Sequence, residues 1–168
     1  MVLEPDSFVA PGQQTAMDSA LIICIGNALA ADDGAGRAVY EELQASPLPG
    51  GIRLKFLGLG GIDLLEELAG EKRLVVVDAV QLGQPFGTVH VLAWEELPAL
   101  ELRPVSGHGI GIREAIEIGR KLYPERIPEL IFLVGIEGSC FDQLGQGLST
   151  EVAAAIPRAV RAVLGLLA

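Results

Sequence analysis

Two adjacent carboxylates, Asp32 and Asp33, lie in the glycine-rich stretch G-N-A-L-A-A-D-D-G-A-G, residues 26–36. Glycine-rich turns often hold a phosphate, but this one lacks the G-x-G-x-x-G spacing of dinucleotide-binding turns and the G-K-[ST] ending of a P-loop. Two carboxylates at the start of a helix would also repel a phosphate from the positive end of the helix dipole. The turn is therefore predicted to favour a cation.

Two residues elsewhere in the chain could act together with this turn. Asp78 follows the apolar run L-V-V-V, and His108 lies in S-G-H-G-I-G, ahead of a predicted helix. Carboxylates and imidazole suit a borderline divalent metal, and three protein ligands leave coordination positions for water or substrate. Asp33, Asp78 and His108 are the candidate residues of a catalytic or substrate-sensing metal site.

Each candidate also has a plainer interpretation. Asp32 or Asp33 could cap the first helix, and His108 could cap a turn. Asp78 is harder to explain without a function, because a carboxylate at the end of a buried strand needs a partner. His90 alternates inside a predicted strand and is interpreted as structural.

Nucleophilic catalysis by serine or cysteine has little support in this sequence. There is no G-x-S-x-G motif, and Cys140 has no basic neighbour in the sequence that would lower the pKa of its thiol. Cys24 and Cys140 show no C-x-x-C spacing, so both are expected to be reduced thiols.

The order of the predicted elements defines the fold class. Short apolar runs predict strands at residues 21–25, 52–57, 74–77, 88–93 and 130–136, and apolar residues at helical spacing predict helices at 35–44, 62–69, 109–123 and 150–167. The alternation predicts a three-layer α/β/α sandwich with a mostly parallel sheet, whose ligands bind at the carboxyl ends of the strands. The short connection before residue 88 predicts an antiparallel or edge strand. Pro157 requires a kink or a local break in the last helix.

The length and net charge of the chain limit how many domains it can contain and which classes of partner it can bind. The 168 residues fit a flexible tail over residues 1–19 and a single domain over residues 20–168. A formal net charge of −10, with no cluster of basic residues, argues against nucleic acid and anionic membranes as partners. No apolar stretch is long enough to span a bilayer, and the start of the chain does not read as a signal peptide, so we expect a cytoplasmic protein.

Several motifs together resemble the hydrogenase maturation endopeptidases. They are the stretch at residues 26–36, V-V-V-D-A-V, P-F-G-T-V-H-V-L, S-x-H before a helix, and G-L-S-T-E-V, and the resemblance extends over about residues 21–168. It implies a protease that removes the C-terminal extension from the precursor of a [NiFe] hydrogenase large subunit after nickel insertion. It also implies a five-stranded mixed sheet with one antiparallel strand.

The resemblance further implies that Asp33, Asp78 and His108 form a metal-binding triad. The nickel would be presented by the substrate precursor, and no organic cofactor is implied. One motif departs from the family: Phe56 lies near a position where many members carry an acid. The role of that acid is therefore not transferred to this chain.

Two mechanisms and one competing function remain open from the sequence. Either a metal-polarised water attacks the peptide bond while a carboxylate takes its proton, or nickel serves only for recognition and Asp32 or another residue handles the proton. The competing function is a non-catalytic checkpoint module that senses the metal, binds the immature subunit and cleaves nothing. Protease and checkpoint module would share the same site.

Overall fold

The computed structural model describes residues 19–58, 61–97 and 111–168. These residues form five strands and four α-helices, which alternate except that β4 follows β3 directly. The strands are β1 (Ala20–Ile25), β2 (Ile52–Leu57), β3 (Arg73–Val80), β4 (Val89–Ala93) and β5 (Leu130–Glu137). The helices are α1 (Ala35–Gln44), α2 (Leu64–Glu67), α3 (Ile112–Leu122) and α4 (Thr150–Gly165).

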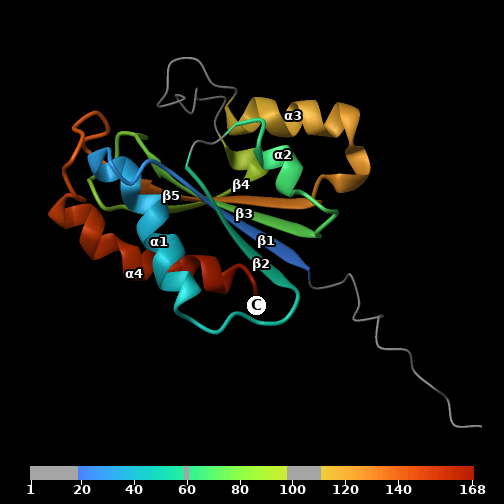
Figure 1. Cartoon of the computed structure of the whole chain (residues 1–168), viewed down its shortest axis with the longest axis horizontal. Coiled ribbons are helices and arrows are strands. Elements are labelled where there is room, and N and C mark those ends of the chain that lie inside the picture. Colours follow the sequence, from blue (N-terminus) through green and yellow to red (C-terminus); the bar gives the residue numbers. More distant parts are fainter. Residues whose placement is uncertain (1–18, 59–60, 98–110) are drawn as a thin grey trace, which may run out of the picture.

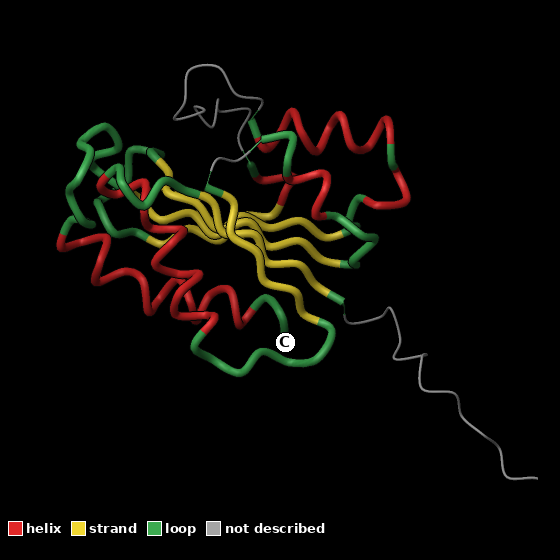
Figure 2. Tube along the Cα trace, viewed as in Figure 1, coloured by secondary structure: helices red, strands yellow, loops and turns green. Residues whose placement is uncertain are grey.

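The five strands form one mixed sheet in the order β2-β1-β3-β5-β4. β2, β1, β3 and β5 are parallel, whereas β4 pairs antiparallel with β5 and lies at an edge, as its short connection predicts. Helices α1 and α4 cover one face and α2 and α3 cover the other (Figures 1 and 2). The predicted three-layer α/β/α sandwich with a five-stranded mixed sheet is confirmed.

The central strand β1 is apolar throughout because both of its faces are covered. In β1, Leu21 and Ile23 pack toward α2 and α3, whereas Ile22 and Cys24 pack toward α1 and α4. All four side chains are fully buried. This two-sided burial explains why β1 shows no polar alternation in the sequence. It also gives the loops at its carboxyl end a rigid base.

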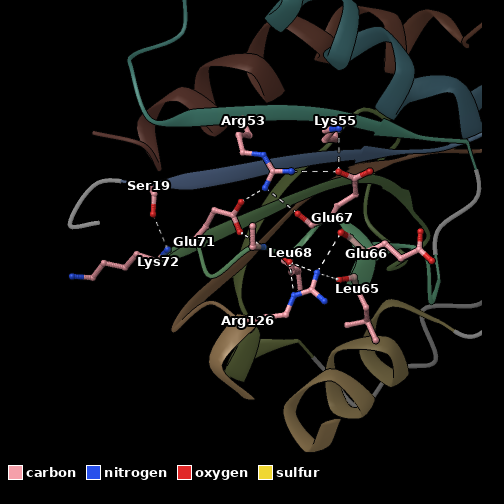
Figure 3. A network of polar contacts seen from close by, with 11 residues as sticks. Ser19, Arg53, Lys55, Leu65, Glu66, Glu67, Leu68, Glu71, Lys72 and Arg126 are labelled. Carbon is pink, nitrogen blue, oxygen red and sulfur yellow. Dashed lines mark hydrogen bonds and ion pairs between the residues drawn. The ribbon is translucent and has the colours of Figure 1, made fainter. Parts of the chain in front are cut away.

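Helix α2 is shorter than predicted, covering residues 64–67 instead of 62–69. It ends at Leu68, which has an extended backbone with ψ of 127°. Two arginines satisfy the carbonyls at this end (Figure 3). Arg53 of β2 donates to the Glu67 carbonyl at 3.0 Å, and Arg126 donates to the Leu68 carbonyl at 2.8 Å. These bonds replace the helical hydrogen bonds that a longer α2 would make.

Other differences from the predicted elements are small. β3 runs through Val80, so Asp78 lies inside the strand near its end instead of directly after it. α4 is assigned as one continuous helix that contains Pro157, whose missing N–H removes one helical hydrogen bond. The predicted tail, apart from Ser19, and His108 lie outside the described residues.

None of the helices in the described ranges is long and apolar enough to cross a bilayer.

Candidate functional site

The glycine-rich turn after β1 folds back closely on the end of that strand. A Cβ added to Gly26, whose φ is +145°, would lie 2.1 Å from the Asp33 carbonyl oxygen. A Cβ on Gly36 would lie 1.9 Å from the Ile25 carbonyl oxygen. Both glycines are therefore required by the close approach of backbone to backbone. Backbone packing therefore explains these two glycines, and no phosphate ligand is needed to explain them.

Asp33 lies in a short 3-10 helix, Ala31–Gly34, between β1 and α1. It is 6% exposed, and its Oδ2 accepts a hydrogen bond from the Asn27 N–H at 2.9 Å. Burial raises the pKa of Asp33 above its ordinary value, and the bond from Asn27 offsets this only in part. Its ionised form is therefore disfavoured where it stands.

Asp78 reaches the same place from the central strand β3. It lies between Val76 and Val80, so its side chain projects from the sheet face that α2 and α3 cover. Its Oδ1 accepts a hydrogen bond from the N–H of Ala79 at 2.8 Å. Burial, and then the negative charge of Asp33, raise the pKa of Asp78 well above its ordinary value. The structure thus brings these two predicted residues together, close enough to repel each other.

No ion pair among the described residues offsets this repulsion. The ion pairs in this part of the chain involve other residues, and none includes Asp33 or Asp78. Within the same residues, no third His, Cys, Asp or Glu joins the two carboxylates in a metal-binding group. His108 lies outside the described part, so its place in the triad stays a prediction.

Asp32 has a different role from its neighbour. It is fully buried, and five hydrogen bonds end on its carboxylate. The Ser149 N–H bonds to Oδ1 at 2.7 Å, and Oδ2 accepts the Ser139 N–H and hydroxyl, the Cys140 N–H and the Ser149 hydroxyl. Burial alone would raise the pKa of Asp32, but these bonds outweigh it and hold the pKa below its ordinary value. Asp32 therefore anchors the turn to the loop between β5 and α4.

Neither aspartate caps the first helix. The N-cap of α1 is Gly34, and no side chain accepts a hydrogen bond there. The 3-10 helix before it also begins without a side-chain cap. The capping interpretation of Asp32 and Asp33 is therefore wrong. The Asp32 carboxylate instead binds the loop between β5 and α4, and the Asp33 carboxylate accepts the Asn27 N–H.

Another buried carboxylate, Glu137, was not singled out from the sequence. Its Oε1 accepts the N–H groups of Leu82 and Gly83, each at 2.8 Å, and Gln84 at 3.3 Å. Its Oε2 lies 3.0 Å from Nε2 of His90, which supports the structural interpretation of that histidine. Glu137 thereby fixes the connection that leaves β3 just after Asp78. The local sequence gives no signal for this role, because the partners lie about fifty residues away.

The two thiols differ sharply in accessibility, which gives a first testable prediction. Cys24 is fully buried, and burial, aided by the charge of Asp78, raises its pKa to about 12. Cys140 is partly exposed, and both cysteines are free. Since the thiolate is the reactive species, iodoacetamide should label the native protein at Cys140 alone and label both cysteines in denaturant, as read by peptide mass spectrometry. Labelling of native Cys24 would contradict the buried position.

The fold and the paired carboxylates together define an α/β protein with two neighbouring acidic side chains at the carboxyl ends of its central strands. Comparison with known proteins makes this more specific. The family model described as hydrogenase maturation protease matches residues 38–166, a segment that contains Asp78 and His108 and begins just after Asp33. Because this match covers more than half of the chain, the chain belongs to the hydrogenase maturation protease family. It is a hydrolase of the protease class.

Individual relatives agree with this assignment. The hydrogenase 2 maturation protease of Escherichia coli K12 is 30% identical over 149 residues, which cover 88% of this chain and 89% of the relative. The hydrogenase expression/formation protein HoxM of Azotobacter vinelandii is 30% identical over 150 residues, covering 88% of this chain and 72% of that protein.

Solved structures show the same fold. The hydrogenase maturating endopeptidase HybD from E. coli has a TM-score of 0.77 at 28% identity and covers 89% of this chain and 91% of its own. The [NiFe] hydrogenase maturation protease HybD from Thermococcus kodakarensis has a TM-score of 0.72 at 26% identity, covering 89% and 99%. The similarity therefore extends over nearly the whole of each protein.

Proposed function

We propose that this chain is a cytoplasmic endopeptidase that removes the C-terminal extension from the precursor of a [NiFe] hydrogenase large subunit after nickel insertion. Asp33, Asp78 and His108 recognise the nickel that the precursor carries. The observation that supports this most is the pair of neighbouring carboxylates, Asp33 and Asp78, which have no counter-ion in the described part of the chain. Their repulsion would be relieved by a bound cation.

The chemistry of the three side chains fits a metal that arrives with the substrate. Two carboxylates and one imidazole supply oxygen and nitrogen ligands to a borderline divalent metal such as nickel. Three ligands leave room for the groups with which the precursor itself holds the ion. A precursor without nickel would leave the carboxylates uncompensated and would bind poorly. Nickel in the substrate thereby controls which precursor is cut, and no organic cofactor is needed.

Proton transfer during hydrolysis falls to a residue other than Asp32. The Oδ2 atom of Asp32 already accepts four hydrogen bonds, and its low pKa makes it a weak base. Asp32 therefore positions Asp33. The two open routes are a nickel-polarised water whose proton passes to Asp33 or Asp78, and a nickel used only for recognition while another residue takes the proton.

Incubation with a nickel-loaded and a nickel-free precursor of a [NiFe] hydrogenase large subunit tests this function. Mass spectrometry follows loss of the C-terminal extension. We expect cleavage of the loaded precursor alone, and loss of cleavage in Asp33→Asn, Asp78→Asn and His108→Ala. Asp63→Asn, which removes an exposed carboxylate at the start of α2, is the matched control and should cleave normally.

The competing function predicts a different result in the same experiment. A checkpoint module would bind the loaded precursor stably and leave its mass unchanged. Equal cleavage of loaded and nickel-free precursor would instead contradict nickel recognition by the triad. The family consists of proteases, which favours turnover over binding alone.

A further inference from the structure

Two exposed leucines lie on paired loops next to the candidate site. The residues Leu29, in the glycine-rich turn, and Leu144, in the loop between β5 and α4, are 68% and 74% exposed. Their loops pair through their backbones: Ala30 forms an antiparallel bridge with Leu144, and the Gly145 N–H donates to the Leu29 carbonyl at 2.8 Å. Both loops lie at the same end of the molecule, where the light-blue start of α1 and the orange loop before α4 are close together (Figure 1). Together Leu29 and Leu144 form what we call the leucine pair.

The leucine pair is held at a fixed position relative to the carboxylates. The Asn27 side chain accepts the N–H of Leu29 at 3.0 Å, while the Asn27 N–H bonds to Asp33 at 2.9 Å. Asp32 binds the first residues of the loop that carries Leu144, through the N–H groups of Ser139 and Cys140. Large apolar side chains fixed in an exposed position mark an interaction site, because a preordered surface loses little entropy on binding.

We propose that the leucine pair is the docking surface for an apolar segment of the precursor, next to the peptide bond that is cut. This inference rests on the proposed function. Leu29 lies beside the candidate site, since Asn27 forms hydrogen bonds with both Leu29 and Asp33. A segment seated on the leucines therefore has its neighbouring residues at the carboxylates. A second copy of this chain fits less well, because two molecules that each carry a net charge of −10 repel one another.

Serine substitutions test this docking surface against the nickel-loaded precursor. Leu29→Ser and Leu144→Ser remove the apolar side chains at positions that are already exposed, so the folded state should be retained. We expect each to raise KM about tenfold, the double variant to raise it further, and kcat to change little. Leu122→Ser, at the far end of α3 and of similar exposure (62%), is the control and should leave KM unchanged.

Binding measured separately from cleavage distinguishes this inference from the proposed function. Calorimetry of the loaded precursor with the wild-type protein and the double variant should show weaker binding to the variant. If the wild type binds but does not cleave, the proposed function fails, while weaker binding by the variant still supports docking. Unchanged KM and unchanged binding in the double variant would overturn the inference. A wild-type protein that sediments as a dimer, with a double variant that sediments as a monomer, would also overturn it. The leucines would then hold two copies of this chain together.

Discussion

Asp32→Asn should lower the free energy of unfolding by about 2–3 kcal/mol, and Asp32→Ala by about 4–5 kcal/mol. The amide keeps one acceptor oxygen but turns an N–H₂ group toward at least one of the five donors that the carboxylate now satisfies. Alanine leaves all five donors without their acceptor. Urea unfolding followed by circular dichroism measures both changes.

The control for Asp32 is a nearby carboxylate without such contacts to the core. Asp142 is exposed, and Asp142→Asn should change stability by less than about 0.5 kcal/mol. An unchanged unfolding midpoint in Asp32→Asn would show that the carboxylate is not the anchor described above. Because the folded pKa of Asp32 is lowered, its contribution is present above its unfolded pKa near 3.8 and is lost as the pH falls through the folded pKa.

Asp78→Asn should have the opposite effect on stability while removing activity. In the folded protein, burial and the charge of Asp33 oppose ionisation of Asp78. The amide has the same shape, keeps an oxygen to accept the Ala79 N–H, and carries no charge. We therefore expect a higher Tm at pH 7 together with a loss of cleavage of about 10²–10³-fold, the usual effect of removing an electrostatic catalytic group. Stability and activity conflict at this position.

The stabilisation by Asp78→Asn should depend on pH in a defined direction. In the wild type, the folded pKa of Asp78 lies above the unfolded value near 3.8, so the wild type loses stability as the pH rises through the folded pKa. The Asp78→Asn variant does not lose stability in this way. Its stability relative to the wild type is therefore greatest above the folded pKa of Asp78, and the difference disappears below about pH 3.8. Thermal unfolding between pH 4 and pH 8 measures it, with Asp63→Asn as the exposed control. A variant less stable than the wild type at pH 7 would contradict the repulsion between the two aspartates.

The sequence predicts the elements of this fold well and the contacts between distant segments poorly. β1 and most of β5 are continuous apolar runs, and α1 and α4 have a clear helical period, so local pattern is sufficient for them. α2 was predicted too long because its end depends on Arg53 and Arg126, which come from other elements. Local periodicity contains no information about such capping groups.

The same distinction applies to the site. The proximity of Asp33 and Asp78 could be predicted because each follows a buried apolar run, and parallel strands bring their carboxyl ends together. The anchoring role of Asp32 could not, because its partners lie more than a hundred residues further along the chain. Two adjacent aspartates are equivalent in the sequence, and the opposite shifts of their pKa values arise only from the folded surroundings.

This long-range anchor has a consequence for the order of events on the ribosome. Asp32 is synthesised early, and Ser139 and Ser149 follow 107 and 117 residues later. Protein synthesis adds about 5–20 residues per second, so the residues that hold the glycine-rich turn are made about 5–20 s after the turn itself. Asp33 is therefore placed only when the last helix begins to form. A nascent or truncated chain would lack the organised turn, so proteolytic capacity should arise with completion of the chain.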